Sequence, residues 1–205
     1  MTFAITGANG FLGVHIIHHL LSKGHAVHAI SRLGASLDEF EQVAQSYDLS
    51  AKENAELVWC YCELYDVEGL VDIFTKADYV MHLAGTISYL QRDYEKMLLV
   101  NQEYTANVVN ACLVSDVKKL LYCSSIAAIT KTNSGEAVHE EIEWNNEVAH
   151  SNYGYTKHLG EYELWRGREE GLATVAINPG IILGYGDWSK GSNQLFGNAA
   201  NQFPF

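Results

Sequence analysis

Residues 6–13 read Thr-Gly-Ala-Asn-Gly-Phe-Leu-Gly, and their neighbours make this stretch decisive for the fold. An apolar run at 3–5 precedes it and predicts a strand, and apolar residues at helical spacing follow it from position 11. In that context Gly7 permits a tight turn, Gly10 lets the backbone approach a diphosphate, and Gly13 lets the helix pack closely on the strand. The first turn of such a helix offers free N–H groups to phosphates. The stretch therefore predicts a dinucleotide-binding turn, with an ordinary glycine-rich connection as the alternative.

The remainder of the chain alternates short apolar runs with longer amphipathic ones. Strands separated by helices of this length require parallel crossovers, so we expect an α/β fold, a doubly wound parallel sheet (Rossmann fold) with helices on both faces. The polar stretch 130–150 is expected to be a loop over the carboxyl edge of the sheet. Strands are expected at 3–5, 26–30, 57–62, 79–83, 119–124 and 174–178, and helices at 11–21, 36–47, 66–76, 92–115 and 151–171.

Composition excludes several classes of protein. The 205 residues are enough for one α/β domain, and 48% of them are hydrophobic. A formal charge of −12 argues against a nucleic-acid partner, because phosphate backbones are bound by clustered Lys and Arg. No run approaches the roughly 18 apolar residues that a membrane span requires. Cys60 and Cys62 lack a second ligand pair, so no metal site is expected, and we expect a cytoplasmic protein.

Tyr153 and Lys157 form a YxxxK pattern near the start of the helix expected at 151–171, and their spacing places them on one helix face. A phenol with a pKa of about 10 is a poor acid or base near neutrality, and a neighbouring ammonium lowers that pKa. Tyr153 is then expected to exchange a proton with the substrate oxygen while hydride moves at a nicotinamide. Tyr155, the rival phenol, lies two residues from Lys157 and is expected to face away. A serine beside the tyrosine would polarise the carbonyl, and Ser124-Ser125 closes the strand at 119–124.

The joint occurrence of TGxxGxxG, a serine pair at a strand end and YxxxK resembles the short-chain dehydrogenase/reductase superfamily. The wording TGANGFLG resembles its extended branch, the NAD(P)-dependent epimerase/dehydratase superfamily. That branch includes dihydroflavonol-reductase-like enzymes, 3β-hydroxysteroid dehydrogenases and nucleotide-sugar epimerases. The resemblance implies that Ser125 is the catalytic serine, with Ser124 nearer the cofactor.

The resemblance also implies further cofactor contacts. Glu63-Leu64 corresponds to a pair that flanks the adenine, although the family has aspartate at the first position. Asn101 matches a position near the nicotinamide, but an asparagine at the start of a helix is equally explained as a cap. Tyr104 stands where the family has glycine, which puts close helix packing there in doubt. The cofactor-binding positions expected in full are Gly7, Asn9, Gly10, Phe11, Leu12, Gly13, Ser31, Arg32, Glu63, Leu64, Leu83, Ala84, Gly85, Asn101, Cys123, Ser124, Tyr153, Lys157, Pro179 and Ile182.

The second expected strand indicates which nicotinamide cofactor is bound. NAD-preferring sites place an acid about 20 residues beyond the glycines, where it binds the ribose 2′-hydroxyl. This chain has Ser31-Arg32 there, and a guanidinium suits a 2′-phosphate. We therefore expect NADP in preference to NAD. The alternative is that Arg32 is a solvated surface residue.

The sequence thus predicts an NADP-dependent oxidoreductase that acts on a carbonyl or secondary alcohol of a small molecule. A nucleotide-sugar epimerase or dehydratase with tightly bound NAD is the alternative, and a non-catalytic dinucleotide sensor is disfavoured by the intact Ser125, Tyr153 and Lys157. Members of the family are longer than 205 residues, so the substrate lobe is expected to be largely absent. We expect a dinucleotide-binding catalytic domain at 1–180, the start of a truncated substrate-binding region at 181–205, and poor turnover by the chain alone. The resemblance leaves a homodimer open.

Overall fold

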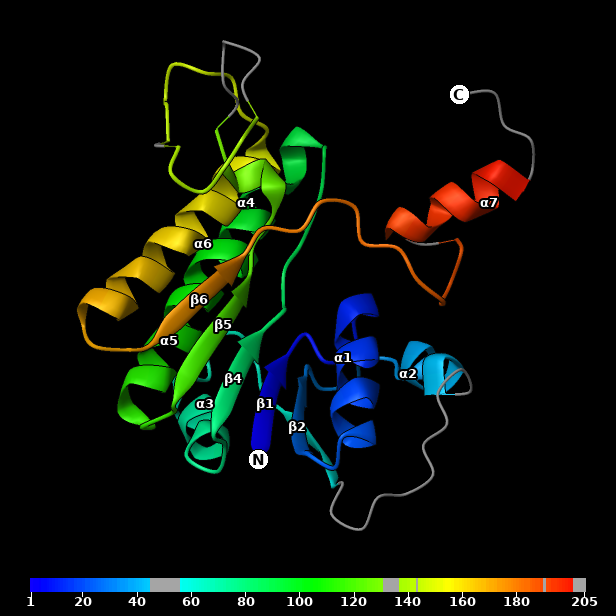
Figure 1. Ribbon diagram of the computed structural model, residues 1–205, viewed down its shortest axis with the longest axis vertical. Coiled ribbons are helices and arrows are strands. Elements are labelled where there is room, and N and C mark those ends of the chain that lie inside the picture. Colours follow the sequence, from blue (N-terminus) through cyan, green and yellow to red (C-terminus); the bar gives the residue numbers. More distant parts are fainter. Residues whose placement is uncertain (45–55, 131–136, 143, 190, 201–205) are drawn as a thin grey trace.

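The computed structural model describes residues 1–44, 56–130, 137–142, 144–189 and 191–200. Within these residues six parallel strands form one sheet in the order β3-β2-β1-β4-β5-β6 (Figure 1). Because the order reverses between β1 and β4, a crevice opens there at the carboxyl ends of the strands. The expected doubly wound parallel sheet is confirmed. The strands are β1 (Thr2–Thr6), β2 (Ala26–Ser31), β3 (Leu57–Tyr61), β4 (Tyr79–His82), β5 (Lys119–Cys123) and β6 (Thr174–Ile177).

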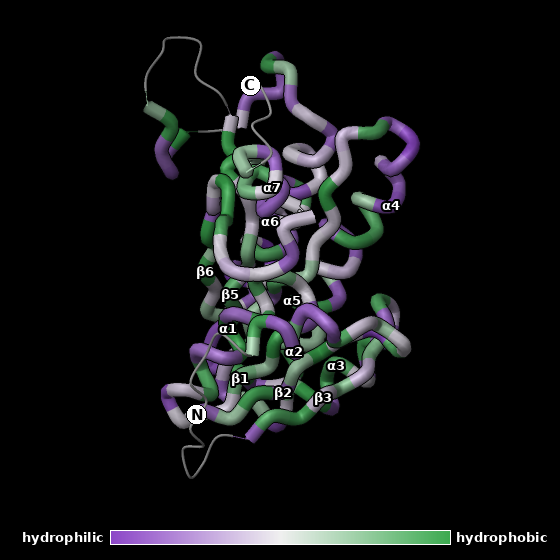
Figure 2. Tube along the Cα trace, turned by 90° about the vertical axis from the view of Figure 1, so that its right-hand side faces the viewer, coloured by the Kyte–Doolittle hydropathy of each residue, from purple (hydrophilic) through white to green (hydrophobic). Residues whose placement is uncertain are grey.

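Helices cover both faces of the sheet, and each face has its own core (Figure 1). Alternate residues of β1 supply the two cores: Phe3 and Ile5 belong to one, and Ala4 belongs to the other. Strands buried on both faces are apolar along their whole length, and Figure 2 shows hydrophobic residues concentrated along the sheet. The first face carries α1 (Phe11–Ser22) and α2 (Asp38–Ala44), and the second carries α3 (Val67–Phe74), α5 (Tyr104–Val114) and α6 (Asn152–Glu169).

The helix expected at 92–115 is helical throughout but is not uniform. A 3-10 turn (Gln91–Asp93) leads into α4 (Tyr94–Leu98), a π-helical turn (Leu99–Glu103) follows, and α5 completes the run. Asn101 lies inside the π-helical turn, so its interpretation as a helix cap is wrong. Single π turns inside α-helices are frequent at functional sites.

Helix α6 approaches the π-helical turn closely because of Gly160. A Cβ atom at this position would overlap the carbonyl oxygen of Asn101 and the hydroxyl of Tyr122. Tyr104, which stands where the related family has glycine, is instead buried with 4% of its surface exposed. Its ring meets the ring of His82 edge-on, with the centroids 5.4 Å apart. The close helix packing put in doubt by Tyr104 is therefore achieved through Gly160.

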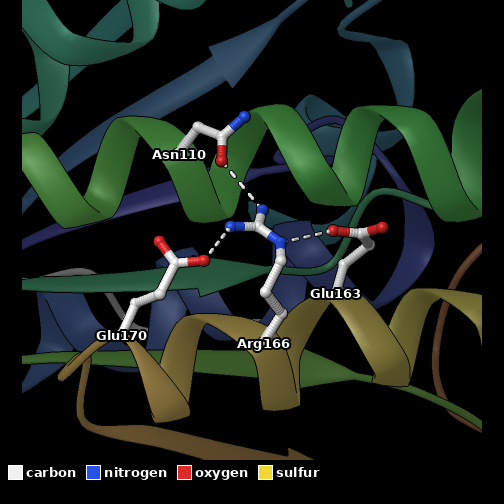
Figure 3. Close-up of polar contacts among 4 residues, drawn as sticks. All are labelled: Asn110, Glu163, Arg166 and Glu170. Atoms are coloured by element: carbon white, nitrogen blue, oxygen red, sulfur yellow. Dashed lines mark hydrogen bonds and ion pairs between the residues drawn. The ribbon is translucent and has the colours of Figure 1, made fainter.

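Arg166 connects α6 to α5 on the outer side of the same helix pair (Figure 3). Its guanidinium donates to Glu163 at 2.9 Å and to Glu170 at 2.7 Å within α6, and to Asn110 Oδ1 of α5 at 2.8 Å. The three contacts hold the guanidinium plane across the groove between the helices, so they fix the register of α5 against α6.

The chain beyond β6 returns to the start of α1. His15 Nε2 lies 2.7 Å from the carbonyl oxygen of Tyr185, and Gly184 and Gly186 pack against the ring of Phe11. A further helix, α7 (Gln194–Ala200), which the sequence analysis did not anticipate, follows this segment (Figure 1). The segment after β6 therefore contacts the start of α1 through Gly184, Tyr185 and Gly186.

Two other expectations are resolved only in part. The helix expected at 36–47 begins at Asp38, and Ser36 Oγ accepts from the amide of Asp38. Residues 45–47 lie outside the described residues, as do 131–136 and 143 of the loop expected at 130–150. None of the helices in the described ranges is long and apolar enough to cross a membrane.

We predict that Gly160→Ala destabilises the chain by about 2 kcal/mol, because α6 has to move away from Asn101 and Tyr122 to admit the methyl group. Urea denaturation followed by circular dichroism measures the change. Gly180→Ala is the matched control: nothing lies within 4 Å of the added atom, and we expect no loss of stability. Equal stability of the two variants would contradict the close approach.

Candidate functional site

The glycine-rich turn adopts a backbone that its sequence requires. Gly7 has a φ of 71°, and a Cβ there would lie 2.6 Å from the amide nitrogen of Ala84 at the end of β4. A Cβ on Gly13 would overlap the carbonyl oxygens of Gly7 and Ala8, so this glycine lets α1 pack on the turn. The turn thus combines a left-handed conformation with two close backbone approaches, and the first turn of α1 begins directly beside it.

A cleft of about 260 Å³ opens above this turn, at the crevice between the carboxyl ends of β1 and β4. Nine of the expected cofactor-binding residues line it: Gly7, Asn9, Gly10, Ser31, Arg32, Leu64, Leu83, Ala84 and Gly85. The charged side chains in its lining are Arg32 and Lys96, both cations and both exposed, in a chain with a formal charge of −12. The lining therefore favours an anionic ligand.

Six further residues that were not among the expected cofactor-binding positions line the cleft: Ile30, Cys62, Thr86, Lys96, Val100 and Tyr104. Three of these, Lys96, Val100 and Tyr104, are spaced four residues apart along α4, the π-helical turn and α5. Such spacing places side chains on one helix face, so helical periodicity counted from Tyr104 offers a signal for Lys96. No short motif marks it.

Glu63 is absent from the cleft lining, whereas its neighbour Leu64 is part of it. The carboxylate of Glu63 instead accepts from the backbone amide of Leu33, at 3.4 Å. Leu33 directly follows Arg32, so an acid from the end of β3 lies beside the turn at the end of β2. The sequence at the end of β2 gives no sign of this acid.

Tyr153 and Ser125 meet at the carboxyl end of β5. The Ser125 side chain is close enough to the Tyr153 phenol to lower its pKa, and Ser125 Oγ accepts from the amide of Ala127 at 3.1 Å. Tyr155 is 38% exposed on the outer face of α6, as expected from its spacing. Ser151 begins α6 as its N-cap, accepting from the amide of Gly154 at 3.0 Å. The cap fixes the helical turn that carries Tyr153.

Lys157 is buried one turn further along α6, with 3% of its surface exposed. Its Nζ donates to the carbonyl oxygen of Cys123 at 2.8 Å and lies 4.2 Å from the centroid of the Tyr122 ring. Burial lowers the pKa of Lys157 to about 8. Both contacts come from β5, so Tyr153 and Lys157 are directed to the same strand end.

The expected lowering of the Tyr153 pKa by Lys157 is wrong. Burial raises the pKa of Tyr153, and the Ser125 side chain only opposes that rise. The physical reason is the geometry of Lys157, whose Nζ is bonded to Cys123 rather than to the phenol. In this arrangement the phenol is a better proton donor at neutral pH than a resident base.

Asn101 joins three elements through its side chain. Its Oδ1 accepts from the Thr86 amide at 2.8 Å, and its Nδ2 donates to the Thr86 carbonyl at 2.9 Å and to Thr156 Oγ1 of α6 at 3.0 Å. The carbonyl oxygen of Asn101, in the π-helical turn, accepts from Thr105 Oγ1 at 2.8 Å. Asn101 thus fixes the segment after β4 against α6.

The remaining expected residues lie around these two centres without lining the cleft: Phe11, Leu12, Gly13, Cys123, Ser124, Pro179 and Ile182. Pro179 is held at the strand end, because its carbonyl accepts from the amide of Ile126 at 3.0 Å. The carbonyl of Ile182 accepts from Ser192 Oγ, which links it to the segment that returns to α1.

A second hollow, of about 350 Å³, lies between α6, β6 and the loop that precedes α6. Trp144 from this loop stacks between His150 and His158, with centroid distances of 3.7 Å to each. Burial lowers the pKa of His158 to about 4. The lining includes Glu140 and Glu161 and contains no Lys or Arg among the described residues, so its charge is opposite to that of the cleft.

The geometry fits a dinucleotide with a nicotinamide. The turn at Gly7 packs its backbone against Ala84 beside the cleft, the cleft carries two cations, and the Tyr153–Ser125 pair lies at the neighbouring strand end. Among the described residues no group of three or more His, Cys, Asp or Glu side chains could hold a metal ion.

Comparison with known sequences gives a consistent family. The sequence model of the NAD dependent epimerase/dehydratase family matches residues 3–203. Cinnamoyl-CoA reductase 1 of Petunia hybrida is 29% identical over 192 residues, covering 88% of this chain and 54% of that protein. Tetraketide alpha-pyrone reductase 2 of Arabidopsis thaliana is 30% identical over 195 residues, covering 89% of this chain and 59% of that protein. The chain spans little more than half the length of these curated relatives.

Among solved structures, the fold is similar to that of UDP-glucuronic acid 4-epimerase from Bacillus cereus in complex with NAD. The TM-score is 0.79 at 20% sequence identity, covering 100% of this chain and 64% of that one. At this level of identity the similarity establishes the fold and not the substrate.

We predict a pH dependence of stability from His158. Its pKa is about 4 in the fold against an ordinary 6.5, so between these values the unfolded chain binds more protons, and stability falls as the pH falls from 6.5 to 4. His158→Gln removes this contribution. In the parent the contribution changes the free energy of unfolding by no more than about 1.4 kcal/mol per pH unit. Urea midpoints at several pH values measure it. His19→Gln, an exposed site on α1, serves as the control and keeps the parental profile; a parental profile in His158→Gln contradicts the prediction.

Proposed function

The chain belongs to the NAD dependent epimerase/dehydratase family, and from that membership we propose that it is an NADP-dependent oxidoreductase, reducing a carbonyl or oxidising a secondary alcohol of a small molecule. The observation that carries the proposal is the convergence of Ser125, Tyr153 and Lys157 on the end of β5, beside the dinucleotide cleft. The names of the sequence relatives, which are reductases, support the same reaction class.

In this proposal the nicotinamide, when bound, donates or accepts the hydride. Tyr153 donates the proton to the carbonyl oxygen during reduction and takes it back during oxidation. Burial raises the pKa of Tyr153, so the phenol is protonated at neutral pH and ready for the reducing direction. Ser125, beside the phenol, orients the same oxygen. The Lys157 amine, held by the Cys123 carbonyl, adds positive charge to this strand end.

NADP is the proposed cofactor because of the charges of the cleft. Arg32 and Lys96 line it, and they are the charged side chains of that lining. A 2′-phosphate adds two negative charges at most to the dinucleotide, and exposed cations bind such groups with little rearrangement. Glu63, beside Leu33, is the feature that opposes this choice, since a carboxylate near the 2′ position favours a hydroxyl.

A nucleotide-sugar epimerase with NAD is the second candidate, favoured by the fold similarity to an epimerase in complex with NAD. The residues at the end of β2 oppose it, because Ser31 and Arg32 stand where an NAD-binding site carries an acid. Co-purified NAD without net oxidation of substrate would favour the epimerase.

We propose different roles for two consecutive segments of the chain. Residues 1–180 carry the cleft lining and Ser125, Tyr153 and Lys157, so we assign them to cofactor binding and catalysis. Residues 181–205 are assigned to the start of the substrate-binding region, and the described part of that segment packs on α1 near Phe11 and His15.

We predict that Arg32→Ala and Lys96→Ala each weaken NADPH binding about tenfold, because each removes a charged contact to phosphate. NADH binding falls less in Arg32→Ala than in Lys96→Ala, because NADH lacks the 2′-phosphate that Arg32 binds in this proposal. Quenching of intrinsic fluorescence during cofactor titration measures both. Lys23→Ala, at the far end of α1, is the matched control and leaves both affinities unchanged. Equal affinity of the parent chain for NADPH and NADH would contradict the NADP assignment.

We predict that Tyr153→Phe leaves the NADPH dissociation constant within about twofold of the parent, because the lost hydroxyl lies beside Ser125 and the phenol does not line the cleft. In a form of the protein that turns over, the same variant abolishes hydride transfer, measured as NADPH oxidation. Tyr155→Phe, on the exposed side of α6, keeps both properties. Full turnover by Tyr153→Phe would refute the proposed role.

A further inference from the structure

Glu161 is a half-buried acid that neither the glycine-rich turn nor the YxxxK pattern includes. It lies four residues after Lys157 on α6, so the two side chains share a helix face. Its Oε1 accepts from Nδ2 of Asn178 at 2.6 Å, just beyond β6. The same Nδ2 donates to the backbone carbonyl of Ser125 at 3.1 Å. One amide group therefore connects the Glu161 carboxylate to the strand end that carries the serine.

The surroundings of Lys157 contain few groups able to balance its charge. From β5 it meets the Cys123 carbonyl and thiol and the face of the Tyr122 ring. From β4 comes His82, whose pKa is lowered to about 3 by burial, so it is neutral. Its own helix contributes the protonated phenol of Tyr153 and the carboxylate of Glu161.

Of these groups Glu161 is the one carboxyl group, and its ionised form is stabilised by Lys157. Burial raises its pKa, while the Ser124 hydroxyl, the Asn178 amide and the Lys157 ammonium each lower it. The coupling is mutual, because Glu161 raises the pKa of Lys157 against the larger effect of burial. A buried ammonium without a counter-charge tends to lose its proton.

We propose that Glu161 is a positioning residue for the Ser125–Tyr153–Lys157 site: it anchors the Asn178 amide that holds the backbone carbonyl of Ser125, and it faces Lys157 from the next turn of α6. The consequence for catalysis rests on the proposed function, whereas the effect on Lys157 does not. Glu161 touches neither Tyr153 nor the cleft lining, so it acts through other residues.

Two variants separate the charge from the hydrogen bond. Glu161→Gln retains an oxygen that accepts from Asn178 but removes the charge, so the Lys157 pKa falls further below about 8, by roughly one unit. Asn178→Ala retains the carboxylate and removes the link to Ser125, so the Lys157 pKa moves less than in Glu161→Gln. Glu161→Asp retains the charge and preserves the parental titration in large part.

The experiment follows the side-chain signals of Lys157 by NMR in the 205-residue chain with 13C- and 15N-labelled lysine, assigned with Lys157→Arg and titrated between pH 6 and 11. Glu163→Gln is the matched control: it removes an acid from the same helix that pairs with Arg166 on the outer side, and the Lys157 titration stays parental. A parental titration in Glu161→Gln overturns the proposal. If Glu161→Gln does not fold, Glu161→Asp is titrated in its place. A Lys157 pKa in Glu161→Asp equal to the Lys157 pKa in the denatured chain overturns the proposal.

A cofactor titration separates this inference from the proposed function. NADPH and NADH are titrated into the parent and Glu161→Gln by intrinsic fluorescence, across the same pH range. If the parent binds neither cofactor, the proposed function fails, and the NMR titration still decides the role of Glu161. If the parent binds cofactor and the Lys157 pKa is the same with and without the carboxylate, only the inference fails.

Discussion

A buried positive charge at the end of β5 is the constraint on which the arrangement of the site depends. Removing an ammonium group from water is costly unless it is hydrogen-bonded and close to compensating charge. Lys157 donates to the Cys123 carbonyl at 2.8 Å and lies 4.2 Å from the centroid of the Tyr122 ring, both on β5, with the carboxyl group of Glu161 one turn away on α6. Helix α6 therefore has to cross directly over the strand end. Gly160 permits the approach, since any side chain there would collide with Tyr122.

The same crossing is fixed a second time by neutral hydrogen bonds. Thr156 Oγ1, on the turn that carries Lys157, accepts from Asn101, whose carbonyl accepts from Thr105. Thr105 lies 3.0 Å from His82 Nε2, and His82 Nδ1 lies 2.6 Å from Thr6 at the start of the glycine-rich turn. A continuous chain of buried contacts thus joins the turn to the helix. Burial keeps His82 neutral, so protonation does not interrupt this chain of contacts near physiological pH.

The sequence predicts the parts of this site that depend on periodicity and short motifs. Strands buried on both faces read as apolar runs, and Gly7 is required by a left-handed backbone, so the sheet and the turn are accessible to sequence reasoning. The π-helical turn at Asn101 is not, because it leaves the surrounding helical pattern of the sequence intact. Lys96 reaches the cleft through tertiary packing. The direction of the Tyr153 pKa shift depends on which oxygen accepts the hydrogen bond from Lys157 Nζ. Spacing along one helix does not reveal that acceptor.

The cations of the site differ in the step at which they lose their hydration, either ligand binding or folding. Arg32 and Lys96 are exposed, so water solvates them until an anion binds. Their desolvation therefore reduces the favourable free energy of binding. Lys157 is already desolvated in the fold, so the cost of burying it falls on stability and is offset by the packing that surrounds it. A group oriented before the ligand arrives stabilises developing charge without reorganising during the reaction. The exposed pair is therefore suited to selecting an anionic ligand, and the buried amine to acting on charge that appears once the ligand is in place.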